Sequence, residues 1–195
     1  MKVIGIVGGM GAGKSSVVEL IKENSKAYVI NADHIGHDVL KKDQIGYIPT
    51  VERFGTEILG EDGEINREIL GSIIFSDPIK RETLNKISHP LIYNRVKKEI
   101  MKITQQGSYD YIVVDAALLI EIRLIELVDE VWGVYALLDA QIQRVMLRND
   151  FSKGEATQRV LSQLPWEETK KVTHVIIDNT GDMSYAKEQV LSLLG

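Results

Sequence analysis

The sequence contains no cysteine, and it has no apolar run long enough to cross a bilayer or to form the hydrophobic part of a signal peptide. Without cysteine the chain can form neither disulfide bonds nor thiolate metal sites, and it has no cysteine nucleophile. We therefore expect a cytoplasmic protein with no membrane partner, whose chemistry depends on oxygen and nitrogen atoms.

An excess of positive charge is also missing. The 195 residues include 23 Lys and Arg against 28 Asp and Glu, which gives a formal net charge of -5. This balance argues against a general nucleic-acid binder, because non-specific affinity depends on neutralising phosphates. The composition is otherwise ordinary for a chain that buries a sizeable core. We expect a single domain over residues 1–195 that acts as a monomer on small molecules.

Five short apolar runs, each flanked by polar or turn residues, are typical of buried strands. Segments with apolar residues on one helical face lie between them, as with Val17, Leu20 and Ile21 after the first run. This alternation predicts an α/β fold in which helices cover both faces of a parallel sheet of about five strands. The expected strands cover residues 3–7, 27–30, 111–114, 131–135 and 174–177.

The alternation stops between about residues 46 and 107, where helical patterns and turn signals replace it. We interpret this interval as a helical insert on the substrate side, within a core formed by residues 1–45 and 108–195. A polar stretch at residues 149–154 follows a predicted helix, and we interpret residues 144–166 as a helical lid.

One motif carries specific chemistry. Residues 8–15, with the sequence GGMGAGKS, match the phosphate-binding pattern G-x-x-x-x-G-K-[ST] between a predicted strand and a predicted helix. The glycines allow backbone N–H groups to point at phosphate oxygens at the positive end of the helix dipole. Lys14 is expected to reach the β and γ phosphates of ATP, and Ser15 to ligate Mg²⁺. A purely structural glycine-rich turn is the alternative. The predicted nucleotide-binding residues are Gly9, Met10, Gly11, Ala12, Gly13, Lys14, Ser15 and Ser16.

Two aspartates follow predicted strands, at the sheet edge where α/β proteins bind ligands. Asp33 is a candidate catalytic base that accepts the proton of an attacking hydroxyl, although it could also cap the next helix. Asp115 has the position of a carboxylate that supports Mg²⁺, although it could equally form a turn.

Other classes of phosphate-loop protein fit less well. Ala116 stands where motor-type ATPases usually carry a glutamate after the strand, and the Asn-Lys-x-Asp motif of GTPases is missing. Arg144 and Arg148 lie four residues apart on one helix face. They could neutralise charge on the transferring phosphoryl group, or they could simply form a solvated surface.

The ordered set of motifs resembles the dephospho-coenzyme A kinase family, whose members phosphorylate the ribose 3′-hydroxyl of dephospho-coenzyme A. The resemblance covers nearly the whole chain. Beyond the phosphate loop it rests on residues 31–33, 54–55, 58–59, 62–67, 70–71, 75–78, 88–92, 115–121, 143–144, 148, 159, 163 and 177–181.

The resemblance implies a phosphate-loop kinase that uses ATP and Mg²⁺ and binds its acceptor between the sheet edge and the helical insert. By this resemblance Asp33 corresponds to the second Asp of the family's Asp-Ala-Asp and is expected to be the base, and Asn179 is expected near the adenine. Arg67 and His89 are candidate acceptor contacts, although each could equally be structural. The sequence differs from the family's usual residues at Asn31, Ala117 and Ile120. These differences leave the expected reaction type intact, and they bear on the fine specificity for the acceptor.

Two other functions stay open at this stage. The chain could be another small-molecule kinase that acts on a nucleoside or nucleotide, or a non-catalytic nucleotide sensor. Acceptor preference distinguishes the first, and Asp33 argues against the second.

Overall fold

The computed structural model describes residues 1–195, and the chain forms two compact units. One unit comprises Met1–Asn31 and Ile100–Gly195 and contains the sheet. The other comprises Ala32–Glu99 and is helical. The helical unit thus begins at Ala32, before the boundary near residue 46 that the sequence suggested, because Gly36 lies close to Ile92 within it.

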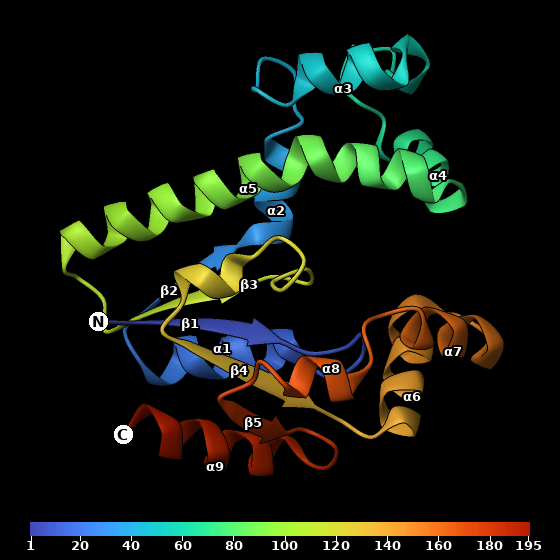
Figure 1. Ribbon diagram of the computed structural model, residues 1–195. Helices are drawn as coiled ribbons and strands as arrows, with labels where there is room; N and C mark the ends of the chain where they lie inside the picture. The colour runs from blue at the N-terminus through green and yellow to red at the C-terminus, as the bar shows by residue number, and fades with distance from the viewer. The chain divides into compact units, whose positions relative to one another are not determined.

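A parallel five-stranded sheet with the order β2-β3-β1-β4-β5 forms the centre of the first unit (Figure 1). The predicted α/β class and the predicted strands are confirmed. The three central strands, β3, β1 and β4, are largely buried, whereas the edge strands β2 and β5 are partly exposed. Their bounds are β1 Lys2–Val7, β2 Ala27–Asn31, β3 Tyr111–Asp115, β4 Glu130–Tyr135 and β5 Val175–Asp178.

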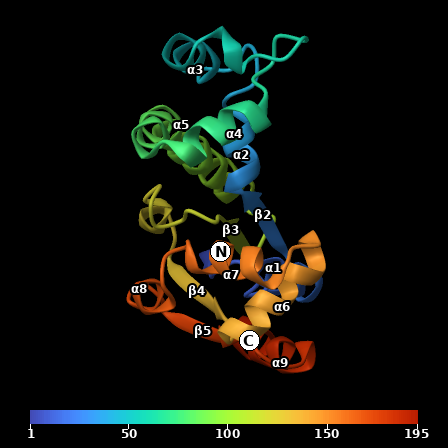
Figure 2. The same ribbon diagram turned by 90° about the vertical axis from the view of Figure 1, so that its right-hand side faces the viewer.

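Two helices, α1 (Lys14–Asn24) and α9 (Met183–Leu194), pack side by side against one face of this sheet (Figures 1 and 2). The opposite side of β1 is covered at Gly5, where a side chain would meet Leu119. Strand alternation places Gly5 opposite its neighbours Ile4 and Ile6, so Leu119 covers the other face. The α1 and α9 layer buries Ile4, Ile6, Val17, Ile21, Val113, Trp132, Ala186 and Val190.

The predicted lid region forms a helical hairpin between β4 and β5. Its helices are α6 (Leu138–Asn149) and α7 (Lys153–Leu161), and the short α8 (Trp166–Lys170) follows. Ser152 begins α7 with a capping box, in which its hydroxyl accepts from the backbone N–H of Glu155. The hairpin has its own small core of Ile142, Val145, Ala156 and Val160, so it can behave as one piece. Its motion stays a prediction.

The helical unit has a separate core of Phe54, Ile58, Leu70 and Leu84. The Asn66 side chain begins one of its helices by accepting from two backbone N–H groups, those of Glu68 and Ile69. None of the chain's helices combines the length and the apolar character needed to cross a membrane. The remaining elements are α2 (Ala32–Asp38), α3 (Tyr47–Phe54), η1 (Thr56–Ile58), α4 (Arg67–Ser76), α5 (Pro78–Gln106) and, in the sheet unit, η2 (Leu124–Leu127).

Candidate active site

The glycine-rich loop connects β1 to α1, as the motif predicts. No side chain caps the start of α1 at Gly13, so backbone N–H groups at this positive helix end are available to an anion. Gly11 and Gly13 have φ angles of 78° and 97°, which side chains with a Cβ rarely adopt. Residues 8–15 therefore form a loop of the kind that surrounds phosphate groups.

Lys14 folds back across this loop. Its Nζ donates to the carbonyl oxygen of Gly8 at 2.6 Å. The ammonium group is thereby held on the β1 side of the loop, within reach of a phosphate chain that runs from the start of α1 toward β1.

Two residues from distant parts of the chain hold the far side of the loop. The Asn179 side chain is buried and donates from Nδ2 to the Ala12 carbonyl oxygen at 2.8 Å. Arg144 donates from Nη2 to the Asn179 carbonyl oxygen at 2.7 Å, and its Nη1 lies 3.3 Å from the carbonyl oxygen of Gly11. Of the predicted residues, the structure brings Asn179 and Arg144 together at the loop.

Two glutamines to which the sequence analysis assigned no role also lie against the loop. Gln163 Oε1 accepts from the backbone N–H of Met10 at 2.5 Å. A side chain at Gly9 would approach Gln141 Oε1 to 2.9 Å. Gln141 lies three residues before Arg144 on α6, so their shared helix face was a usable signal. Gln163 is 153 residues from Met10, and no local pattern links the two.

An acidic and an amide residue lie in register where two neighbouring strands end. Asp115 is the last residue of β3, and it is in register with Ile6 of β1 and Asn31 of β2. The phosphate loop begins directly after β1, so Asp115 lies at the sheet edge that carries the loop. Asp33 follows two residues after Asn31, in the first turn of α2, and is exposed. Because α2 begins at Ala32, Asp33 lies inside the helix rather than at its capping position.

Arg148 differs from Arg144 in its contacts. It is exposed, and its Nε donates to the side chain of the adjacent Asn149 at 3.1 Å. The two arginines share a helix, but only Arg144 bonds to the phosphate loop.

Within the helical unit, Arg67 lines a cavity of about 320 Å³ with both apolar and charged walls. Burial lowers the pKa of nearby His37, and the positive charge of Arg67 lowers it further, whereas the carboxylate of Asp33 raises it. The cavity therefore combines charged side chains, Arg67 among them, with an apolar surface. Its lining residues are His37, Leu40, Lys41, Glu64, Ile65, Arg67 and Leu70.

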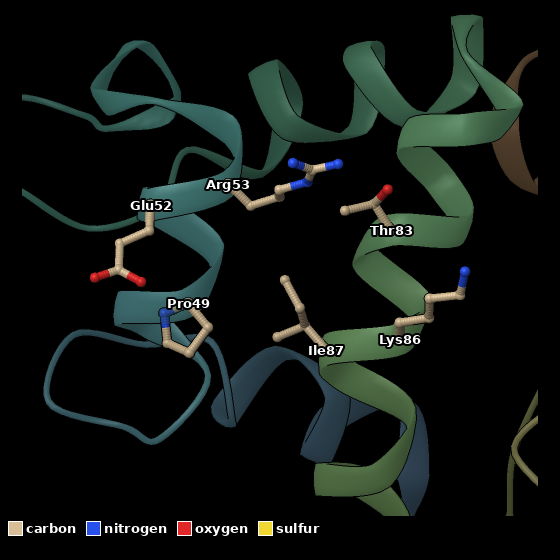
Figure 3. A pocket seen from close by; sticks show the side chains of 6 residues that line it. All are labelled: Pro49, Glu52, Arg53, Thr83, Lys86 and Ile87. Carbon is tan, nitrogen blue, oxygen red and sulfur yellow. The ribbon is translucent and has the colours of Figure 1, made fainter.

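A second, more open groove of about 480 Å³ lies between α3 and α5. Figure 3 shows Pro49 and Ile87 on its two sides, with Arg53 extending from α3 toward Thr83 on α5. The other candidate acceptor contact, His89, is on α5 and half-buried, and it does not line either hollow.

Comparison with known proteins places these features in a family. The family model described as dephospho-CoA kinase matches residues 2–184. A curated dephospho-CoA kinase from Carboxydothermus hydrogenoformans is 40% identical over 194 residues, which cover 100% of this chain and 93% of the relative.

Solved structures show the same fold. A crystal structure of a Thermus thermophilus protein aligns with a TM-score of 0.80 at 25% identity, covering 99% of this chain and 95% of that one. The dephospho-CoA kinase from Campylobacter jejuni aligns with a TM-score of 0.72 at 23% identity, covering 98% and 94%.

Proposed function

Because the chain belongs to the dephospho-CoA kinase family, a family of phosphotransferases, we propose that it transfers the γ-phosphoryl group of ATP to the ribose 3′-hydroxyl of dephospho-coenzyme A. One observation carries the assignment of the site: an intact phosphate loop with Lys14 folded across it, at the sheet edge that also bears Asp115. The residue roles below follow from this arrangement.

The nucleotide is proposed to bind with its phosphates on the N–H groups of residues 9–16. Lys14 then exchanges its bond to the Gly8 carbonyl for phosphate oxygens, which carry more negative charge. Asn179 is proposed to contribute on the adenine side. Its side chain already bonds to the loop, so its contribution there is to hold Ala12 and the loop carbonyls in place.

Mg²⁺ fits the donors near the loop in chemical type, since Ser15 offers a hydroxyl and Asp115 a carboxylate. The chain has no group of three or more His, Asp or Glu side chains that could hold a metal ion alone. Ser15 and Asp115 would therefore hold the ion together with the phosphates of the nucleotide, as is usual for Mg²⁺. Bound there, the ion would neutralise charge on the β and γ phosphates.

Asp33 is the proposed base. An exposed carboxylate in the first turn of α2, just after the end of β2, can accept a hydrogen bond from an acceptor hydroxyl and take its proton during transfer. Phosphoryl transfer depends mainly on position and electrostatics, so orienting this hydroxyl in line with the γ-phosphorus is the larger part of the role.

The two arginines of α6 are proposed to have different roles. Arg144 holds the loop and the Asn179 carbonyl, and it adds positive charge beside the bound nucleotide. Arg148 is exposed on the same helix, and it is the one proposed to swing toward the γ-phosphoryl group and neutralise its equatorial oxygens.

The helical unit is proposed to bind the acceptor. Its cavity of about 320 Å³ combines the Arg67 cation with Leu40 and Leu70, a combination that suits a ligand with a diphosphate and an arm that has aliphatic segments. His89 remains a proposed acceptor contact. The cytoplasmic location and monomeric state expected from the sequence remain predictions.

Single substitutions test these roles. Asp33→Asn keeps the shape of the side chain and removes its basicity, so turnover should fall at least about a hundredfold while ADP affinity stays within about twofold. Glu52→Gln, at an exposed position of the helical unit, is the matched control and should leave both unchanged. Wild-type turnover in the Asp33→Asn variant would remove Asp33 from the mechanism. Ser15→Ala and Asp115→Asn should instead raise the Mg²⁺ concentration required for half-maximal activity.

A further inference from the structure

Met10 connects the phosphate loop to the α6–α7 hairpin in two independent ways. Its side chain packs against the small core of the hairpin. Its backbone N–H is bound by Gln163, which lies in the segment between α7 and α8. Met10 is therefore held by both the hairpin core and the segment that follows the hairpin.

The contact of Gln163 has the chemistry of a bound phosphate. Its amide oxygen carries partial negative charge and accepts from the Met10 N–H group, which an anionic oxygen could accept from in its place. The Gln141 oxygen approaches the adjacent Gly9 from α6. Two glutamine oxygens thus lie against the outer part of the loop.

The position of Met10 along the loop indicates which phosphate would compete for this N–H group. The β phosphate belongs at the start of α1, where no side chain caps the helix. Lys14, which reaches between β and γ phosphates, bonds at the opposite end to Gly8, two residues before Met10. The Met10 N–H group is therefore on the γ-phosphate side, where ATP has an oxygen and ADP has none.

We propose that Gln163 is a positioning residue that distinguishes ATP from ADP. In the free and ADP-bound protein its oxygen holds the Met10 N–H group and keeps the α7–α8 segment on the loop. ATP displaces it, since the γ-phosphoryl oxygen is the stronger acceptor. The release of Gln163 frees that segment to move only when the phosphoryl donor is present. This inference rests on the proposed nucleotide site and adds a role for a residue outside the motif.

The test compares the affinities of ADP and a non-hydrolysable imido analogue of ATP, with Mg²⁺, by calorimetry. Gln163→Ala removes a hydrogen bond that ATP alone must break, so the ratio of analogue affinity to ADP affinity should rise about fivefold. Gln163→Glu places a carboxylate there, which holds the N–H group more strongly and repels the γ phosphate. The same ratio should fall at least about tenfold.

The matched controls are Gln158→Ala and Gln158→Glu. Gln158 is an exposed residue of α7 whose side chain makes no hydrogen bond. They should leave the ratio within about twofold of wild type. An equal ratio in all Gln163 variants would overturn the proposal while leaving the nucleotide site intact. Failure of the wild-type protein to bind either nucleotide would overturn the nucleotide site itself.

A direct observation of the Met10 amide provides the second readout. The protein contains five methionines, so ¹⁵N-methionine labelling gives a sparse spectrum, and Met10→Leu assigns the signal. Gln163→Ala should shift this signal in the free protein. In wild type, the ATP analogue should shift it much further than ADP does. Equal shifts with both nucleotides would contradict the proposal.

Discussion

Asn179 lies so close to Gly13 that a Cβ atom on Gly13 would overlap the side-chain nitrogen of Asn179. That nitrogen donates to the carbonyl oxygen of Ala12, so the side chain cannot move away from Gly13 without losing this bond. The contact explains why the last glycine of the motif must be glycine, in addition to its φ angle of 97°.

Gly13→Ala should therefore destabilise the protein by about 1–3 kcal/mol, the range for a non-glycine residue in a left-handed conformation, and weaken ADP binding at least about tenfold. Gly154→Ala is the control: it lies in α7, where a Cβ has no atom within 4 Å. It should be neutral or stabilise by about 0.4–1 kcal/mol. Chemical denaturation and ADP titration measure both quantities. Equal effects of the two substitutions would contradict the account.

Substitutions of the two arginines of α6 should differ in their effects on ADP binding and on reaction rate. Arg144→Lys loses the planar group that spans the loop carbonyls and Asn179, so ADP should bind about tenfold more weakly. Arg148→Gln breaks no bond to the loop and should leave ADP affinity unchanged while lowering kcat about a hundredfold. Steady-state kinetics and ADP titration of both variants distinguish the role in binding from the role in rate. A normal kcat in Arg148→Gln would assign it to the solvated surface.

His37 reports on the cavity that we assign to the acceptor. Burial and then the charge of Arg67 lower its pKa, His34 lowers it too, and Asp33 and Asp38 raise it. Arg67→Gln should therefore raise the pKa of His37, as followed by NMR titration of the imidazole C–H signals. Lys42→Gln, a neighbouring exposed lysine, should leave it unchanged.

The lowered pKa of His37 also determines how this residue changes the stability of the protein with pH. A histidine with a lowered folded pKa binds its proton more readily when unfolded, so it destabilises the fold as pH falls through the unfolded value of about 6.5. Arg67→Gln should lessen that loss of stability between neutral and mildly acidic pH. Dephospho-coenzyme A should raise the pKa of His37 in wild type, because its phosphates offset Arg67. An unchanged pKa with saturating ligand would place the acceptor elsewhere.

The sheet and the phosphate loop were predictable because both are local in sequence. Each strand is a short apolar run, and Gly13, Lys14 and Ser15 are specified by a contiguous motif. The boundary of the helical unit was harder, because α2 follows β2 directly and resembles the next helix of an alternating fold. Contacts between residues far apart in the sequence, such as that of Gly36 with Ile92, assign it to the other unit.

The contacts around the loop could be predicted only in part. The sequence predicts Asn179 near the nucleotide and Arg144 near the phosphoryl group. It does not predict their bonds to Ala12 and Gly11, which join residues more than a hundred positions apart. For Gln163 the sequence indicates only that the family shares this position. Side-chain amides carry no periodicity or charge signal, so their role becomes visible only when the fold places them against a backbone N–H group.

The most direct test of the account is acceptor-dependent release of ADP from ATP and Mg²⁺, with dephospho-coenzyme A compared with AMP, CMP and adenosine. The account predicts turnover with dephospho-coenzyme A alone, formation of a 3′-phosphate on its ribose, and loss of this turnover in Asp33→Asn with ADP binding retained. Turnover with AMP, CMP or adenosine in place of dephospho-coenzyme A would contradict the proposed acceptor, and ATP binding without turnover on any of the four would contradict the proposed catalysis.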